Sequence, residues 1–248
     1  PKSSFPRRRE CMTFVDSRLR GNDGNLYNLK RTMNLASRYN AIPGISLGTK
    51  LFLHLRWWLT PYERMAAYVP KSGKVLDVGC GHGLLSMEMA LSEPNRSVLA
   101  TDHDVARIEL AKQAGKGISN LQFEVNTGSP VADGTFDAIM MIDFLHYFSP
   151  EQQDDMIAKA YANLQPGGWL LAREVNQQGG LISKMNQFYE KITTTIGFTK
   201  SNNIQAQENL SFKSQAGWEA KFAEHGFKVR SEPCSSPIFA DILYICQR

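Results

Sequence analysis

Short apolar runs alternate with longer amphipathic stretches along most of this 248-residue chain. Apolar runs bounded by turn-forming residues are typical of buried strands, and apolar residues spaced three or four apart are typical of helices. This alternation predicts an α/β fold. The expected strands are 75–78, 97–101, 121–125, 136–142, 169–175, 227–232 and 239–246.

The stretches between these runs predict helices. Residues 33–70 are expected to be helical because Leu51, Leu55 and Trp58 recur at helical spacing. Within this range Pro61 occupies the favoured first position of a second helix. Further helices are expected at 84–91, at 104–115, after Pro150, and from Ser214 to His225.

Residues 1–32 lack this periodicity and carry eight Lys or Arg residues against three acidic residues. Their sequence resembles the peptide produced when a common bacterial intergenic repeat is translated. We therefore expect a disordered or non-native extension, with Met33 as the natural start. A basic arm that binds nucleic acid or membrane is the alternative, and no apolar core follows the arginines as in a signal peptide.

The charge of the remaining chain bears on its partners. The whole chain has 28 Lys and Arg and 24 Asp and Glu, so removing the eight and three of residues 1–32 leaves 20 against 21, a net charge of −1. This near-neutral body gives no argument for nucleic acid. No apolar run is long enough to insert across a membrane. The four cysteines lack zinc spacing and indicate reduced thiols in a cytoplasmic protein.

The strongest chemical signal follows the first predicted strand. Gly79, Gly81 and Gly83 stand at alternate positions, and Asp77 lies two residues before the first of them. Glycine permits backbone angles closed to other residues and lets a ligand approach the backbone. A dinucleotide site reads G-x-G-x-x-G and would need glycine at Leu84, so the spacing disfavours a nicotinamide oxidoreductase.

The stretch Val75–Gly83 resembles the first motif of the class I S-adenosylmethionine-dependent methyltransferases. Phe136-Asp137 and the turn Leu164–Trp169 are similar to later motifs of that family. The resemblance implies a Rossmann-like, seven-stranded, mostly parallel sheet with its last strand antiparallel and helices on both faces. It implies one domain over 33–248, made of N-terminal helices 33–70, a cofactor-binding core 71–175, an acceptor-site insertion 176–213, and a C-terminal helix and strand pair 214–248.

S-adenosyl-L-methionine is the cofactor that this resemblance implies. A carboxylate at the end of the second strand can accept both ribose hydroxyls, and Asp102 occupies this place, although it could instead cap the next helix. Asn126 stands where the family often has an aspartate that meets the adenine amino group. The implied cofactor site comprises Asp77, Gly79, Cys80, Gly81, Gly83, Asp102, His103, Asn126, Thr127 and Ile142.

The acceptor side leaves more alternatives open. Trp57 and Trp58 either shape the acceptor pocket or pack against the sheet. The apolar stripe of the insertion forms either a lid over the carboxyl edge of the sheet or an ordinary surface helix. Candidate catalytic bases are expected at this edge, and His146 has a packing role as its alternative. These candidates are Asp143, His146 and Glu174.

These features predict a methyltransferase that acts on a small, partly apolar metabolite, with O-methylation favoured over N-, S- or C-methylation and without a metal. The loop after the fourth strand lacks the Asn/Asp-Pro-Pro-aromatic sequence of related adenine and glutamine-amide methyltransferases. Nucleic acid is therefore not expected as a partner. The alternative is a protein that binds S-adenosylmethionine without catalysis.

Overall fold

The computed structural model describes residues 34–176, 211–234 and 241–248. The predicted extension 1–32 and most of the predicted insertion 176–213 lie outside the described residues. Residues Asn34–Arg248 form one compact unit. In the part that is described, no helix is long and apolar enough to cross a membrane.

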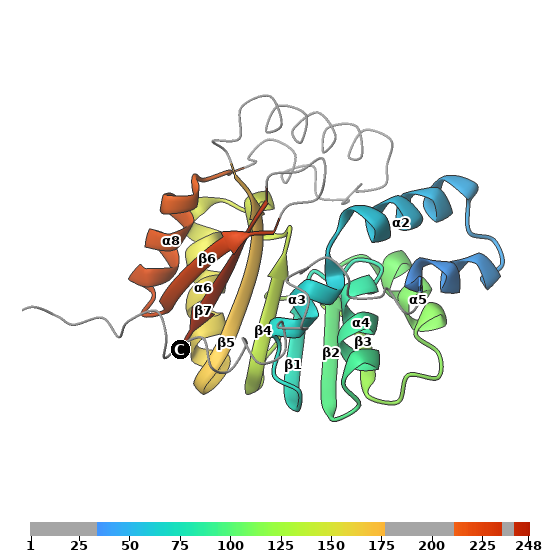
Figure 1. The fold of residues 1–248 in the computed structure, drawn as a ribbon, viewed down its shortest axis with the longest axis horizontal. Coiled ribbons are helices and arrows are strands. Elements are labelled where there is room, and N and C mark those ends of the chain that lie inside the picture. The colour runs from blue at the N-terminus through green and yellow to red at the C-terminus, as the bar shows by residue number, and fades with distance from the viewer. Residues whose placement is uncertain (1–33, 177–210, 235–240) are drawn as a thin grey trace, which may run out of the picture. The chain divides into compact units, whose positions relative to one another are not determined.

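One seven-stranded sheet organises this unit (Figure 1). Its strands are β1 (Gly73–Val78), β2 (Arg96–Asp102), β3 (Leu121–Val125), β4 (Phe136–Ile142), β5 (Leu164–Val175), β6 (Lys228–Pro233) and β7 (Asp241–Gln247). Their order is β3-β2-β1-β4-β5-β7-β6, with β7 antiparallel to both neighbours and β1 to β5 parallel. The predicted sheet with an antiparallel last strand is confirmed. The order reverses beside β1, where α/β sheets bind ligands at the carboxyl ends of their strands.

Helices cover both faces of this sheet (Figure 1). They are η1 (Leu35–Ala41), α2 (Leu47–Leu59), α3 (Tyr62–Tyr68), α4 (Leu84–Ser92), α5 (Val105–Ala114), η2 (Leu145–Tyr147), α6 (Pro150–Asn163) and α8 (Gln215–Glu224). Successive side chains of a strand point to opposite faces, so each strand supplies two cores. Val75 and Met140 pack with η1 and α2 to α5, whereas Leu76 and Met141 pack with α6 and α8.

Most observed boundaries differ from the predicted ones by one or two residues, and the start of β5 differs by five. Strand β5 begins at Leu164 rather than at Trp169, because Leu164 pairs with Phe136 across an irregularity in the β4–β5 register. Pro61 lies at the N-cap of α3, one position before the predicted place. Helix α8 begins after Ser214, whose side chain accepts the backbone N–H of Gly217 as an N-cap.

Arg96 joins three elements on one face of the sheet. Its buried guanidinium donates to the backbone carbonyls of Ala66, Val69 and Pro70 around the end of α3, and to that of Met89 in α4. The last carbonyls of a helix have no partner within the helix. Arg96 therefore satisfies two helix ends at the start of β2.

We expect Arg96→Met to lower the free energy of unfolding by about 3 kcal/mol, because it leaves several carbonyls without a donor. Urea denaturation followed by circular dichroism measures this change. Arg230→Met, at an exposed position of β6, is the control and should change stability by less than about 0.5 kcal/mol. Equal losses in the two variants would contradict the role of Arg96.

Candidate functional site

The turn after β1 contains three glycines that are needed for different reasons. Gly79, Gly81 and Gly83 have φ angles of 69°, 55° and 72°. A Cβ atom at Gly79 would lie 2.3 Å from the ring of Phe144, and one at Gly83 would lie 2.3 Å from the ring of Phe123. A Cβ atom at Gly81 would meet no atom within 4 Å. The outer glycines therefore allow packing, whereas Gly81 presents bare backbone to open space, where a ligand can approach.

Asp102 holds this loop from the end of β2. Its Oδ2 accepts the backbone N–H of Gly81 at 2.8 Å, and its Oδ1 accepts that of Asp104 at 2.9 Å. A carboxylate offers about four lone-pair positions, so both oxygens keep capacity for further donors. The residue that caps α5 is Asp104, which accepts from Arg107. Asp102 can therefore receive hydroxyl groups beside the open backbone of Gly81.

Asp77 lies buried at the end of β1, where its Oδ2 accepts from Ser86 Oγ at 2.5 Å. Burial, helped by the negative charge of Asp102, raises the pKa of the Asp77 carboxyl to about 7, against the opposing effect of the Ser86 hydrogen bond. Burial next to Asp77 and Asp102 also raises the pKa of the Cys80 thiol well above its ordinary value. Cys80 is therefore a neutral packed thiol in the loop.

The N-terminal helices contact the glycine loop through two residues that the sequence analysis missed. Tyr39 of η1 is buried, and its hydroxyl donates to the backbone carbonyl of His82. Burial, together with the positive charges of Arg107 and Arg56, lowers the pKa of His82 to about 3, so its imidazole is neutral. A single tyrosine within a helical pattern carries no signal that separates it from ordinary core packing.

The other predicted cofactor residues lie along the same edge of the sheet but differ in exposure. His103 has a side chain that is 55% exposed, Thr127 is exposed, and Ile142 is buried at the end of β4. The side chain of Asn126 is engaged in its own turn, where Oδ1 accepts from the backbone of Gly128 and Nδ2 donates to the carbonyl of Ser129. A contact between adenine and residues 126–127 stays a prediction.

His146 of η2 and Glu174 of β5 form a buried pair. Nδ1 of His146 lies 2.6 Å from Oε2 of Glu174, and the histidine is 0% exposed. Oε1 of Glu174 accepts the backbone N–H groups of Phe144 at 3.2 Å and Leu145 at 2.7 Å. The His146 ring stacks on Phe212 with ring centroids 5.1 Å apart. A carboxylate at Nδ1 selects the tautomer in which Nε2 carries the lone pair.

Asp143 has a different environment. Its φ of 53° makes it the one non-glycine residue with positive φ in the described part of the chain. Its carboxylate oxygens lie 2.8 and 2.7 Å from Nη1 of Arg173, and Oδ2 lies 3.4 Å from Nη2 of Arg56. Arg173 is buried and also pairs with Asp241. Burial alone would lower the pKa of Arg173, but the two aspartates outweigh this effect and raise it.

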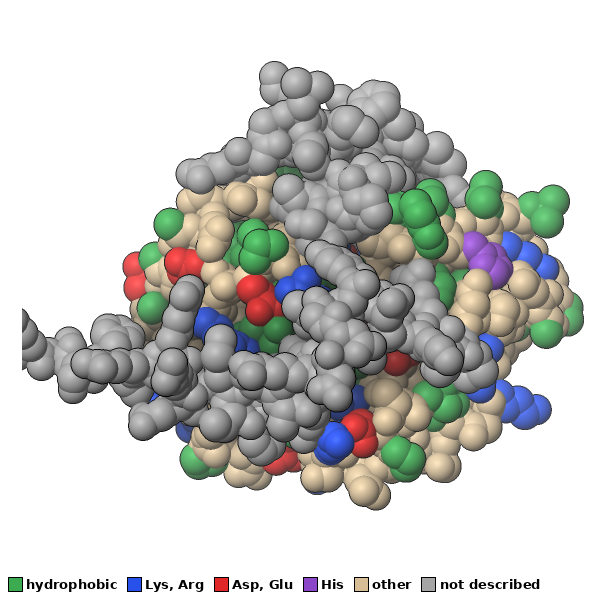
Figure 2. Space-filling model, viewed as in Figure 1, with side chains coloured by type: hydrophobic (Ala, Val, Ile, Leu, Met, Phe, Trp, Pro, Cys, Tyr) green, Lys and Arg blue, Asp and Glu red, His purple; other side chains and the backbone are tan. Residues whose placement is uncertain are grey.

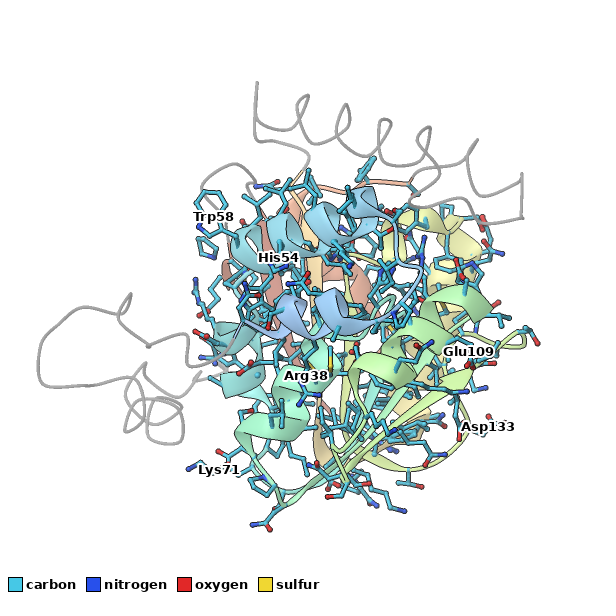
Figure 3. The ribbon with its side chains drawn as sticks, turned by 90° about the vertical axis from the view of Figure 1, so that its right-hand side faces the viewer. Arg38, His54, Trp58, Lys71, Glu109 and Asp133 are labelled. Atoms are coloured by element: carbon cyan, nitrogen blue, oxygen red, sulfur yellow. The ribbon has the colours of Figure 1, made fainter. Side chains whose placement is uncertain are left out.

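The arginine in the predicted strand 169–175, next to Glu174 and after four apolar residues, was the sequence signal that could have revealed this network. The two tryptophans lie in different environments. Trp57 is buried and stacks on Tyr62 with centroids 5.3 Å apart, as in the packing interpretation, whereas Trp58 is 60% exposed at the end of α2 (Figure 3).

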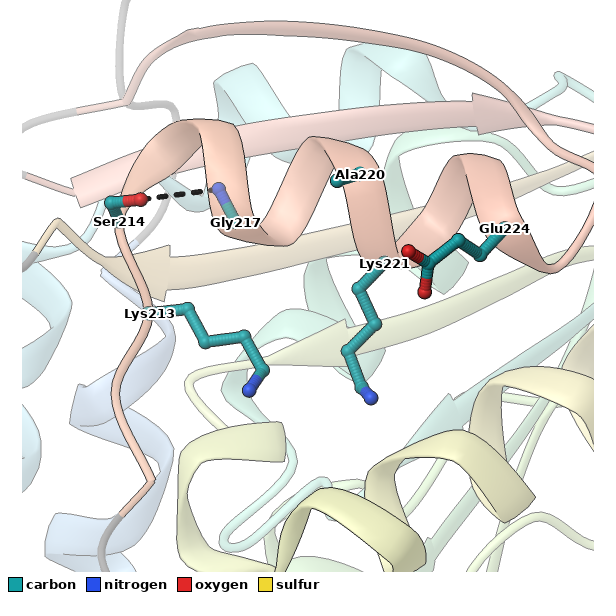
Figure 4. Close-up of a pocket in the computed structure, with 6 residues that line it drawn as sticks. All are labelled: Lys213, Ser214, Gly217, Ala220, Lys221 and Glu224. Carbon is teal, nitrogen blue, oxygen red and sulfur yellow. Dashed lines mark hydrogen bonds between the residues drawn. The ribbon is translucent and has the colours of Figure 1, made fainter.

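A separate surface hollow lies along α8 (Figure 4). It is lined by Lys213, Ser214, Gly217, Ala220, Lys221 and Glu224. None of the predicted site residues contributes to it, and Lys221 is paired with Asp154 at 2.5 Å. The candidate site is therefore the carboxyl edge of the sheet, where the loops after β1, β2 and β4 meet.

Known methyltransferases are similar to this chain in sequence and fold. The family described as "Methyltransferase domain" matches residues 75–168. The chain is 26% identical over 185 residues to the ubiquinone/menaquinone biosynthesis C-methyltransferase UbiE of Geotalea daltonii, a match that covers 70% of this chain and 77% of that protein. It is 32% identical over 172 residues to ribosomal RNA small subunit methyltransferase C of Escherichia coli, a match that covers 66% of this chain and 47% of that protein.

The fold is similar to that of an O-methyltransferase family 2 protein from Planctomyces limnophilus, solved in complex with apigenin. The TM-score is 0.62 at 18% identity, and the match covers 80% of this chain and 60% of that chain. Apart from its match to UbiE, the chain spans slightly less than half the length of the curated relatives that it matches.

The raised pKa of Asp77 makes stability depend on pH. The folded protein keeps this proton up to about pH 7, whereas the unfolded chain releases it near 3.8. Between these values the folded state binds more protons, so the free energy of unfolding falls as pH rises, by at most about 1.4 kcal/mol per pH unit, and the decrease ends above the folded pKa.

We expect Asp77→Asn to remove this component, so that urea denaturation at several pH values shows wild type losing stability relative to the variant as pH approaches 7. Ser86→Ala removes a hydrogen bond that lowers the pKa, and should move the end of the decrease to higher pH. Parallel profiles for wild type and Asp77→Asn would contradict the assignment.

Proposed function

We propose that this chain, which belongs to the class I S-adenosylmethionine-dependent methyltransferases, transfers a methyl group to a hydroxyl of a small, partly apolar acceptor. The family, the fold and the cofactor agree with the matched methyltransferase domain and with the relatives. The observation that carries the O-methylation proposal is the buried contact between His146 and Glu174 at the carboxyl edge of the sheet.

Gly81 and Asp102 would hold the adenosyl part of S-adenosylmethionine. The bare backbone of Gly81 leaves room for a ligand, and the oxygens of Asp102 have capacity for the two ribose hydroxyls. When bound, the cofactor supplies a methyl group on a positively charged sulfur that is already activated for in-line transfer. The protein then has to align the acceptor and exclude water.

His146 is assigned as the general base. Its Nε2 would take the proton from the acceptor hydroxyl while the oxygen attacks the methyl carbon. Glu174 orients the imidazole and stabilises the imidazolium that forms, and the N–H groups of Phe144 and Leu145 fix Glu174 in turn. We therefore assign Glu174 a positioning role in place of the predicted catalytic one.

Asp143 is assigned a positioning role as well. Its carboxylate contacts the guanidinium groups of Arg173 and Arg56, so its oxygens are engaged in these ion pairs. These contacts join the end of β4 to α2 and β5.

A general base at His146 favours some methyl acceptors over others. A neutral amine needs little help, whereas a hydroxyl or a carbon acid needs a base. C-methylation is the second candidate, because the relative UbiE is a C-methyltransferase. The near-neutral body of the chain, with 20 basic and 21 acidic residues after position 32, favours a small molecule over the RNA on which the ribosomal relatives act.

Two measurements test the proposal in sequence. Mass spectrometry of ligand released from purified protein should find S-adenosylmethionine or S-adenosylhomocysteine. Incubation with a panel of small phenols and with carbon-acid acceptors should then give O-methylated products. C-methylated products would select the second candidate, and retained cofactor without turnover on any acceptor would favour a binding protein.

We expect His146→Ala to lower kcat by about 10²- to 10⁴-fold, the usual contribution of a positioned base. Product formation on the best acceptor measures this change, and calorimetry should show unchanged affinity for S-adenosylhomocysteine. His225→Ala, at the C-cap of α8 and paired with Asp154, is the matched control and should keep normal kcat. Unchanged turnover in His146→Ala would remove the base assignment.

We expect Gly81→Ala to weaken S-adenosylhomocysteine binding by at least about tenfold, because its methyl group enters the space assigned to the cofactor. Gly117→Ala is the control, since Gly117 also has positive φ and open space around its Cβ direction, and it should bind normally. Gly83→Ala should instead lower thermal stability through its clash with Phe123. Normal binding by Gly81→Ala would place the cofactor elsewhere.

A further inference from the structure

Helix α2 exposes a stripe of apolar side chains on its outer side. Leu47, Leu51, Leu55 and Trp58 are 84%, 70%, 39% and 60% exposed. Their spacing of four, four and three residues places them on one face of the helix. Of the seven large hydrophobic residues that are exposed in the described part of the chain, four belong to this stripe. Such clustering indicates an interaction surface.

In the described part of the chain, the buried contacts of α2 come from the face opposite this stripe. The opposite face of α2 carries Leu53 and Trp57, which are buried in the core on one side of the sheet. These residues already anchor the helix. Figure 2 shows hydrophobic side chains gathered over the region of α2, and Figure 3 shows His54 and Trp58 on its outer side.

One basic residue of α2, Lys50, lies near the stripe. No aspartate or glutamate occurs between Asn34 and Thr60, and the arginine of α2, Arg56, is paired with Asp143. Lys50 stands one helical turn from Leu47, on the same side of the helix as His54. An apolar stripe with a lysine near it and no acidic residue on its helix is complementary to a surface that is apolar below and negatively charged above.

We propose that the outer face of α2 docks this protein on the surface of an anionic lipid bilayer. The leucines would enter the acyl boundary, Trp58 would lie at the headgroup level, and Lys50 would meet lipid phosphates. The twelve residues from Leu47 to Trp58 span roughly 16 Å along the helix and about 10 Å across it. A strip of this size is much smaller than the roughly 800 Å² per partner of a stable protein interface, which disfavours a second copy of the chain.

Vesicle co-sedimentation of the full chain tests this docking. Wild type should sediment with vesicles that contain phosphatidylglycerol, and much less with pure phosphatidylcholine. The double variant Leu47→Ser/Leu51→Glu should lose at least about tenfold in partitioning. Val105→Glu introduces the same charge at an exposed apolar position of α5 and should bind as wild type does. Affinity for S-adenosylhomocysteine should stay within about twofold in each variant, which separates this result from any failure of the proposed function.

The basic residues of 1–32 need their own comparison, because charge alone can hold a protein on anionic vesicles. Replacing Arg7, Arg8 and Arg9 by serine should reduce partitioning less than the double leucine variant does. The opposite ranking would overturn the proposal in favour of the arm. The proposal would also be overturned if wild type did not bind the vesicles. In that case, a dimer that the leucine variant separates in sedimentation equilibrium would show that a second copy covers the stripe. A loss of thermal stability in the variant would show that the chain itself covers it.

Discussion

The site depends on one backbone constraint, which is that the chain must leave β1 through three residues with positive φ. Only glycine enters this region at low cost, and here the constraint is reinforced by two aromatic rings. Phe144 fills the space beside Gly79, and Phe123 fills the space beside Gly83. The loop is therefore clamped at both ends, and the backbone between them stays open at Gly81. Rigid ends and an open middle give a ligand a preformed surface.

Two buried clusters of charged residues lie at this edge of the sheet, one made of carboxylates and the other centred on an arginine. On one side, burial and the negative charge of Asp102 raise the pKa of Asp77, and the hydrogen bond from Ser86 opposes this effect. On the other side Arg173 holds Asp143 and Asp241. Buried charges need such partners because desolvation is expensive. Their arrangement at the end of β4 and β5 positions the loop that carries His146.

Much of the fold could be predicted from the sequence because its signals are local. Strand periodicity, the glycine turn and helix caps such as Ser214 depend on residues within a few positions of each other. The predicted start of β5 was wrong because it rested on local signals alone. The pairing between Leu164 and Phe136 joins residues far apart in the chain, and a Pro-Gly-Gly stretch reads locally as a turn.

The sequence by itself determined the α/β class and the glycine loop with Asp77, because residues close together in the chain encode them, and the resemblance of this loop to a methyltransferase motif implied the cofactor. Tertiary structure alone decided which glycine faces open space, and that Glu174 contacts His146 rather than acting separately. It also placed Arg56 and Arg173 against Asp143. These contacts join elements up to 87 residues apart. Sheet order decides which side chains meet at such distances, and no local pattern of residues records it.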